Sequence, residues 1–418
     1  MNIKIFDLGM NGEGVGELDG KKIFVPKALP GEVVDIEIVK DCGNYAHARL
    51  LKLVQTHVDR CEPACTYSDC GGCDLMHMTY DCQLRFKRDL VRKTIKKISG
   101  LDVDVKDCVP SDKQFGFRNK VSFSFTTNAG GMLAASSHNV VNIDKCMLAT
   151  DIQNEIFHLF KCNINPSDMK YIKNLVVKDF ALGVLICVVV KQEVDLQEFY
   201  NVLKDKFVNI GLSQMVNNRR DSVVLSGKMI HVGGLKMLEM DEFGLTYPID
   251  MLAFHQTNEN IQNKIYSKMF EYINDGDTVV NGYSGAGVLS GIIAKKAKQV
   301  IGIEIVSSSH KSAELLKKCN RIDNLTNICG DFTLEYKRVA KAIGEHTLVL
   351  DPSKKGCGQI ISDIKTPNKI IYLSCNPIAM AKDLRLMEEY YTIKEVIPFD
   401  MFPNTKSVET LVLLERRG

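Results

Sequence analysis

Ile370-Ile-Tyr-Leu-Ser-Cys-Asn-Pro377 is the stretch that decides how the rest of the chain is interpreted. An apolar run rich in β-branched residues ends in a polar turn that contains Cys375. This pattern predicts a buried parallel strand that delivers the cysteine to the carboxyl edge of a sheet. Ligands and chemistry collect at that edge in open α/β folds. A thiolate there can act as a nucleophile, whereas a lone cysteine is more often a small buried apolar residue.

Strands and helices alternate around this stretch, which predicts a separate α/β domain over residues 251–418. The turn Gly282-Tyr-Ser-Gly285-Ala-Gly287 follows a strand at 278–281 and precedes a helix at 288–297. Glu304 ends the next strand, at the position where an acidic residue binds a ribose diol in nucleotide-binding folds. The full G-x-G-x-x-G pattern is absent, which favours an adenosyl ligand without a pyrophosphate, namely S-adenosylmethionine. Further strands are predicted at 327–329, 347–350 and 369–373, followed by Asp331, Asp351 and Ser374-Cys375.

Residues 1–56 alternate short β-like runs with glycine turns. This pattern predicts a small closed barrel of the OB type, a fold that commonly binds single-stranded nucleic acid. The segments Gly9-Met-Asn-Gly-Glu-Gly-Val-Gly16 and Leu29-Pro-Gly-Glu-Val33 resemble a TRAM domain, which implies RNA binding. A generic small barrel is the alternative.

Four cysteines, Cys61, Cys65, Cys70 and Cys73, lie close together in the segment that follows. Such a cluster in a chain with reduced thiols predicts a metal site. Two kinds of site fit the spacing: a zinc ion bound by the four local sulfurs, or an iron–sulfur cluster with a distant ligand. Cys146 is the candidate for that distant ligand. Cysteines without a metal are the remaining alternative.

Residues 57–250 are predicted to form a central mixed α/β domain that carries this cysteine cluster. Strands are expected at 117–125, 182–190 and 223–232, and helices at 151–162 and 196–207. An amphipathic helix at 83–99 is expected to be able to dock on the catalytic domain. Its polar side carries Arg85, Lys87, Arg88, Arg92, Lys93, Lys96 and Lys97. These cations could neutralise RNA phosphates or form a solvated helix face.

The overall composition places few limits on function. The chain has 418 residues, which suggests two or three domains, and 53 basic against 51 acidic residues. A nucleic-acid partner would therefore depend on local basic patches. The 14 cysteines are unevenly spaced and do not suggest a disulfide framework. With no signal-like start and no apolar run longer than 180–190, we expect a cytoplasmic protein without a membrane partner.

Together these motifs resemble the bacterial class I RNA uracil-C5 methyltransferases, in particular the TRAM-containing 23S ribosomal RNA 5-methyluridine group. The resemblance covers essentially the whole chain. Its most specific segments are Ser374-Cys-Asn-Pro377 and Met401-Phe-Pro-Asn-Thr-Lys-Ser-Val-Glu409. Phe254-His-Gln256-x-Asn258 and Asp351-Pro-Ser-Lys-Lys-Gly-Cys357 support it.

The resemblance implies roles for individual residues. Cys375 would be the nucleophile that attacks carbon 6 of uracil, and Glu409 the general base that removes the carbon 5 proton. Contacts to S-adenosylmethionine or the target base would come from Gln256, Tyr283, Glu304 and Asp351. A 4Fe–4S cluster would be bound by Cys65, Cys70, Cys73 and Cys146, with Cys61 as the competing fourth sulfur.

The resemblance also implies a substrate: a uridine in 23S ribosomal RNA, bound by a monomer. The rivals are the same chemistry on the T-loop of transfer RNA, and a non-catalytic RNA-binding or ribosome-assembly protein with a degenerate methyltransferase domain. Several positions depart from the family pattern. Asn281, Ser284, His255 and the pair Ser353-Lys354 replace usual residues, and the Cys65–Cys70 spacing is one residue short.

Overall fold

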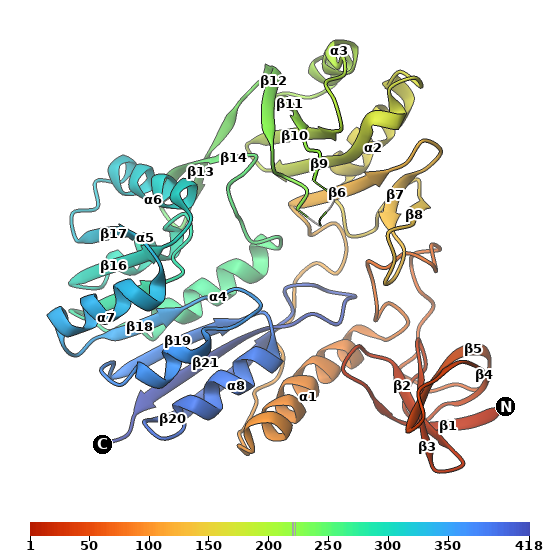
Figure 1. Cartoon of the computed structure of the whole chain (residues 1–418), viewed down its shortest axis with the longest axis horizontal. Coiled ribbons are helices and arrows are strands. Elements are labelled where there is room, and N and C mark those ends of the chain that lie inside the picture. The colour runs from red at the N-terminus through yellow and green to blue at the C-terminus, as the bar shows by residue number, and fades with distance from the viewer. Residues whose placement is uncertain (220, 222) are drawn as a thin grey trace.

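The structure, a computed structural model, describes residues 1–219, 221 and 223–418 and has three parts (Figure 1). The first is a closed barrel with strand order β1-β2-β3-β5-β4. Side chains alternate between a buried interior and an exposed surface along its strands, and Ile5, Ile23 and Val34 fill the interior. The strands are β1 (Asn2–Leu8), β2 (Gly14–Leu18), β3 (Lys21–Val25), β4 (Val33–Asp41) and β5 (Tyr45–Gln55).

The second part is a seven-stranded sheet with the order β12-β11-β10-β9-β6-β7-β8. Every residue of β10 is buried, as its apolar sequence predicts, because helices cover one face and a separate hairpin packs on the other. The elements are β6 (Lys120–Phe125), β7 (Gly130–Leu133), β8 (Val140–Asn142), α2 (Asp151–Asn163), β9 (Ile172–Phe180), β10 (Gly183–Val190), α3 (Gln197–Lys206), β11 (Ile210–Val216) and β12 (Lys228–Gly234). The hairpin consists of β13 (Met237–Glu242) and β14 (Leu245–Asp250).

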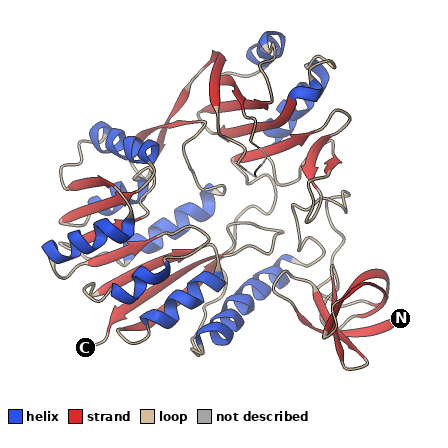
Figure 2. Ribbon diagram, in the orientation of Figure 1, coloured by secondary structure: helices blue, strands red, loops and turns tan. Residues whose placement is uncertain are grey.

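The third part is a doubly wound sheet with the order β17-β16-β15-β18-β19-β21-β20. Helices cover both faces of this sheet (Figure 2). Its strands are β15 (Thr278–Gly282), β16 (Gln299–Glu304), β17 (Leu325–Cys329), β18 (Thr347–Leu350), β19 (Lys369–Ser374), β20 (Tyr391–Phe399) and β21 (Glu409–Arg416). Its helices are α4 (Glu259–Glu271), α5 (Val288–Ala294), α6 (Ser307–Cys319), α7 (Phe332–Ile343) and α8 (Pro377–Met387).

Helix α1 (Tyr80–Ser99) lies in sequence between the barrel and the central sheet, yet it packs on the third part. Val91 and Ile95 are fully buried in the same core as Met380 and Leu384 of α8. This packing places the segment that follows the cysteine cluster against the C-terminal sheet. No helix among the described residues is long and apolar enough to cross a membrane.

The predicted fold class is confirmed: an N-terminal barrel, a central mixed sheet and a C-terminal Rossmann-like sheet are all present. The differences lie at element ends and in long-range pairings. Helix α1 begins at Tyr80 rather than at residue 83, and α5 ends at Ala294 rather than at 297. The antiparallel pair β20–β21 was not predicted, although it contains Glu409.

Candidate active site

Strand register brings Cys375 and Glu409 together at the carboxyl edge of the sheet. Ser374, the last residue of β19, pairs with Thr410 of the antiparallel β21, so Cys375 and Glu409 flank the same pair. Leu350 pairs with Tyr372 on the other side of β19, and Asp351 therefore follows the neighbouring strand. Sequence-distant residues thus meet at one edge, as doubly wound folds require for a ligand site.

Burial and mutual charge set the protonation of these groups. Burial, with the Glu409 carboxyl nearby, raises the pKa of the Cys375 thiol to about 11, while Lys354 opposes the shift. Burial and the Asp351 carboxyl raise the pKa of Glu409 well above its usual value, again opposed by Lys354. Burial also raises the pKa of Asp351 to about 7. We call Cys375, Glu409, Asp351 and Lys354 the catalytic edge.

Lys354 was noted in the sequence only as a departure from the family pattern. The structure places it at the catalytic edge because Asn376 Nδ2 donates a hydrogen bond of 2.8 Å to its carbonyl oxygen. Asn376 also caps α8 by accepting from the backbone N–H of Ile378. The residue after Cys375 therefore ties the Lys354 loop to the nucleophile candidate.

The glycine turn after β15, where the sequence predicts adenosyl binding, follows a neighbouring strand of the same sheet. Tyr283 has φ +62°, a left-handed conformation that turns the chain sharply after the strand. Its ring packs on Phe332 with 4.8 Å between ring centroids. Glu304 Oε2 accepts a hydrogen bond of 2.8 Å from the backbone N–H of Gly285. A carboxylate has further acceptor positions, so Glu304 can still bind ribose hydroxyls.

Gln256 lies at the entrance to α4 and is almost fully buried. Its carbonyl oxygen accepts 2.8 Å from Asn119 Nδ2, which links the central sheet to this loop. His255, which stands where the family usually has an aromatic residue, is 3.2 Å from Glu242 Oε2 of the hairpin. The His255 ring also packs edge-on against Phe180 of β9, with 5.2 Å between the ring centroids, so this position combines an aromatic contact with a polar one.

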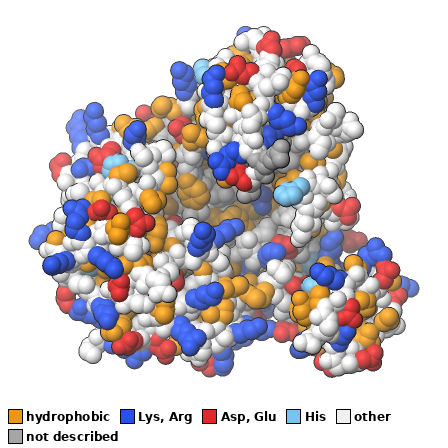
Figure 3. All heavy atoms as spheres, viewed as in Figure 1, with side chains coloured by type: hydrophobic (Ala, Val, Ile, Leu, Met, Phe, Trp, Pro, Cys, Tyr) orange, Lys and Arg blue, Asp and Glu red, His pale blue; other side chains and the backbone are white. Residues whose placement is uncertain are grey.

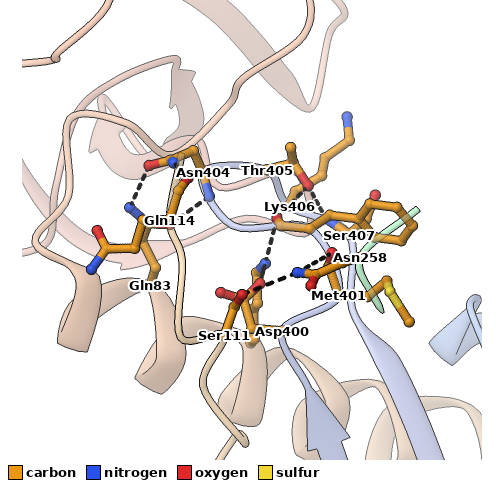
Figure 4. A network of polar contacts seen from close by, with 12 residues as sticks. Gln83, Ser111, Gln114, Asn258, Asp400, Met401, Asn404, Thr405, Lys406 and Ser407 are labelled. Atoms are coloured by element: carbon orange, nitrogen blue, oxygen red, sulfur yellow. Dashed lines mark hydrogen bonds and ion pairs between the residues drawn. The ribbon is translucent and has the colours of Figure 1, made fainter. Parts of the chain in front are cut away.

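The loop before Glu409 is fixed from α1 (Figure 4). Gln83 Oε1 accepts a hydrogen bond of 2.9 Å from the N–H of Asn404, and Gln83 Nε2 donates one of 3.2 Å to Asn404 Oδ1. The fully buried Lys87 pairs with the fully buried Asp400 and donates 3.0 Å to the carbonyl of Phe402. These contacts join residues more than 300 positions apart, so no local pattern could reveal them.

The basic face of α1 is mostly neutralised. Ion pairs with acidic residues occupy Arg85, Lys87, Arg88, Arg92, Lys93 and Lys96. Lys97 is the exception among the seven, within the described residues. The fully buried Lys87 is not available to RNA, whereas the other pairs lie at the surface, where such pairs are weak. Phosphate binding by the remaining cations therefore stays a prediction, as does the alternative of a solvated helix face.

Cys65, Cys70, Cys73 and Cys146 line one small pocket. Hydrogen bonds fix the backbone around this pocket. The N–H of Gly71 donates a hydrogen bond of 2.9 Å to the carbonyl of Leu133, and the side chain of Asn154 in α2 binds both the N–H and the carbonyl of Cys146. Cys61 is not among the lining residues, and its Sγ lies 3.6 Å from the Met76 carbonyl. We call this site the four-cysteine pocket.

The lining of the four-cysteine pocket suits an anionic group. Arg118 and Lys145 line it, whereas no acidic side chain is among its lining residues. The buried Nε of Arg118 has no hydrogen-bond partner in the described part of the chain. A guanidinium N–H left without a partner is costly, and an anionic ligand would satisfy it. Across the described residues, no group of three or more His, Cys, Asp or Glu side chains converges closely enough to hold a single metal ion.

Comparison with known proteins agrees with this architecture. Residues 79–417 match the model of the tRNA (uracil-5-)-methyltransferase family, and residues 1–51 match the TRAM domain. A protein of Clostridium tetani named as an uncharacterized RNA methyltransferase is 32% identical, over 100% of this chain and 96% of that protein. One of Listeria innocua with a similar name is 30% identical, over 99% of this chain and 97% of that protein.

A solved structure extends the similarity to the whole fold. The tRNA (uracil-54, C5)-methyltransferase of Pyrococcus abyssi, in complex with S-adenosyl-L-homocysteine, superimposes with a TM-score of 0.81 and 25% identity. The match covers 99% of this chain and 100% of that one.

Proposed function

Because the chain belongs to the tRNA (uracil-5-)-methyltransferase family, a family of S-adenosylmethionine-dependent RNA (uracil-5) methyltransferases, we propose that it methylates carbon 5 of a uridine in 23S ribosomal RNA. The position of Cys375 beside Glu409, across the β19–β21 pair, carries the reaction part of the proposal. The choice of 23S ribosomal RNA rests on the resemblance of the sequence motifs. A nucleophile and a base at one sheet edge, next to an adenosyl-type turn, match the needs of this reaction.

The reaction begins when the Cys375 thiol loses its proton to solvent and the resulting thiolate attacks carbon 6 of uracil. The new S–C bond pushes the carbon 5–carbon 6 electron pair into an enolate. Carbon 5 then attacks the methyl group of the sulfonium, whose C–S bond breaks to release S-adenosylhomocysteine. Glu409 takes the proton from carbon 5, the double bond re-forms, and the S–C bond to Cys375 breaks.

The raised pKa values at the catalytic edge fit these roles. A carboxylate with a raised pKa is a stronger base once ionised, as removal of a carbon-bound proton requires. The Cys375 thiol is protonated in the free protein, and the Lys354 cation favours its thiolate form. The uracil must leave its stack to reach the edge, so a flipped nucleotide is expected. A hollow between the three parts of the molecule provides room for RNA (Figure 3).

The T-loop of transfer RNA is the second candidate substrate. The Pyrococcus abyssi protein is named for transfer RNA and covers 99% of this chain. Its similarity extends over the barrel and the cysteine segment, so these segments do not favour ribosomal RNA over transfer RNA. We also propose a cytoplasmic location and action as a monomer.

We further propose that the four-cysteine pocket binds a 4Fe–4S cluster through Cys65, Cys70, Cys73 and Cys146. The shared pocket and the unpaired Arg118 Nε support it. Among the described residues no group of three or more His, Cys, Asp or Glu side chains is close enough to hold a metal ion, so the support for the cluster comes from the pocket lining and from Arg118. The cluster would supply a structural cross-link among these four positions.

The test is methyl transfer from labelled S-adenosylmethionine to unmodified 23S ribosomal RNA and transfer RNA transcripts, followed by nucleoside mass spectrometry. We expect 5-methyluridine in the ribosomal transcript alone. 5-Methyluridine in the transfer RNA transcript alone would mean that the substrate is the T-loop of transfer RNA. No product in either RNA, together with no S-adenosylmethionine binding, would favour the non-catalytic RNA-binding protein.

A further inference from the structure

The outer face of the barrel carries an exposed group of rings on two paired strands. Phe24 of β3 lies opposite His47 of β5, and Lys22 lies opposite Tyr45. The three rings contact one another, with centroid distances of 5.6 to 5.8 Å. These side chains alternate with Ile23 and Ala46, which point into the barrel core. We call Phe24, Tyr45 and His47 the ring platform.

The ring platform is open to solvent. Tyr45 is 41% exposed, and the platform lines an open hollow of about 500 Å³ together with Glu13, Lys22 and Asn44. Barrel stability does not require aromatic side chains at these outward positions. An exposed apolar patch rimmed by polar groups indicates an interaction site.

The polar groups around the platform suit a nucleic-acid strand. The Lys22 ammonium lies 5.2 Å from the centroid of the Phe6 ring and forms no ion pair with any described acidic residue. The Glu13 carboxylate is already occupied by the backbone N–H and the side-chain amide of Asn11. The rings pack on one another edge-on or tilted, and the cation and the amide of Asn44 beside them provide partners for a phosphate and a base edge.

We infer that the ring platform stacks unpaired nucleobases of the RNA that flank the methylated uridine. The inference rests on the proposed function, because RNA is the substrate class of the family. Stacking on aromatic side chains is tolerant of sequence, since every base has a π-face. The platform matters here because α1, the other basic element, has most of its charges engaged in ion pairs.

A second hollow extends the path of the strand. It lies between the barrel and α1, has a volume of about 900 Å³, and shares Lys22 and Phe24 with the platform hollow. Lys97, the basic residue of α1 without an ion pair in the described chain, lines this second hollow. The acidic residues in its lining, Asp7, Asp59 and Asp89, are paired with Lys93, Arg85 and Arg92, and Glu13 binds Asn11. An RNA strand stacked on the platform can therefore continue along α1 with Lys22 and Lys97 near its phosphates.

The chain contains no tryptophan, so a single introduced Trp is a unique reporter. In Tyr45→Trp, which keeps a stacking ring, oligouridine of about 12 nucleotides is expected to quench the emission in a saturable manner. Leu51→Trp is the matched control, because Leu51 is an exposed position of the same strand outside the platform, and its emission should not change. Circular dichroism would verify that both variants are folded.

Loss of the rings should weaken RNA binding more than it changes the chemistry. In Phe24→Ala/Tyr45→Ala, binding of oligouridine and of the methylated transcript should weaken about tenfold or more, with kcat retained at saturating RNA. Tyr45→Phe should restore most of the affinity, and Leu51→Ala should leave it unchanged. The inference would be overturned, even if methyl transfer occurs, by either of two results. One is an unchanged RNA affinity of Phe24→Ala/Tyr45→Ala, and the other is unquenched emission of Tyr45→Trp while anisotropy shows that the RNA is bound. Quenching without methyl transfer would support the platform while the proposed function fails.

Discussion

The catalytic edge and the four-cysteine pocket both contain partly buried thiols, but the surroundings of these thiols differ. At the catalytic edge Cys375 faces two carboxyl groups and one cation. In the four-cysteine pocket the sulfurs face one another, Arg118 and Lys145, and no acidic side chain is in the lining. Burial raises the pKa of Cys70 and Cys73 as it raises that of Cys375, but the neighbouring charges act in opposite directions. The two carboxyl groups add to the shift at the catalytic edge, whereas Arg118 opposes it in the four-cysteine pocket.

The two regions are connected through the backbone. Leu75, two residues after Cys73, donates 3.0 Å from its N–H to the carbonyl of Asn404. Asp74 Oδ2 accepts 3.3 Å from the N–H of Lys406. The loop that leads to Glu409 is therefore held by the segment that carries a predicted cluster ligand. Disruption of the pocket should reach the catalytic edge through this loop.

The largest expected effect comes from Cys375→Ala. Without the sulfur no adduct with carbon 6 can form, so methyl transfer should fall by at least about a thousandfold. S-adenosylmethionine binding should be retained, as measured by calorimetry. Cys319→Ala, at an exposed cysteine of α6, is the matched control and should retain full activity. Persistent 5-methyluridine formation by Cys375→Ala would remove the nucleophile from the mechanism.

Glu409→Gln should separate adduct formation from its resolution. The methylated adduct cannot lose its carbon 5 proton without the base, so turnover should fall by about a hundredfold or more. A covalent protein–RNA species should accumulate and appear as a shifted band on a denaturing gel. Its absence in Cys375→Ala/Glu409→Gln would link it to the sulfur. A Glu409→Gln enzyme with normal turnover and no shifted band would assign the base role to another group.

The sequence predicted the residues at strand ends better than the contacts that hold them. Cys375, Asp351 and Glu304 could be placed because an apolar run followed by a polar residue defines a strand end. The position of Glu409 beside Cys375 could not be derived from pattern, because it depends on the antiparallel insertion of β21 next to β19. The seven cations of α1 suggested phosphate binding or a solvated helix face, and the ion pairs that five of them form with residues outside the helix became visible only in the structure.

Cys73→Ala should test the connection between the two regions, with Cys61→Ala as its control. Because Cys73 lines the pocket and Cys61 does not, only Cys73→Ala should lose bound iron from anaerobically prepared protein. The loss should lower Tm by at least about 5 °C and methyl transfer by about tenfold. Hydrogen exchange should increase in residues 401–408, since their hydrogen bonds to Asp74 and Leu75 loosen.

The results for Cys73→Ala and Cys61→Ala distinguish a wrong assignment of the cluster ligands from a wrong connection between the two regions. Equal iron loss in both variants would mean that Cys61 is a ligand and that the assignment of the four sulfurs is wrong. If Cys73→Ala loses iron but hydrogen exchange in residues 401–408 does not become faster, the assignment of the pocket stands. The proposed connection between the pocket and the catalytic edge would then be wrong. Stoichiometric zinc in place of iron would contradict the cluster proposal itself.

The smallest expected effect concerns the pH dependence of S-adenosylmethionine binding. Burial raises the pKa of Asp351 to about 7, so its carboxyl is neutral below that pH and ionised above it. An ionised Asp351 attracts the sulfonium cation, and affinity should therefore rise several-fold between about pH 6 and about pH 8. S-adenosylhomocysteine lacks the positive charge and should show a weaker dependence. In calorimetric titrations the affinity of Asp351→Asn for S-adenosylmethionine should depend less on pH.

Because Glu409 also has a raised pKa, Glu409→Gln is the matched control, and its affinity should keep the pH dependence of the unaltered protein. If the pH dependence of the affinity disappears in Glu409→Gln but persists in Asp351→Asn, the titrating group is Glu409. The predicted catalytic base, rather than Asp351, would then control binding of the methyl donor.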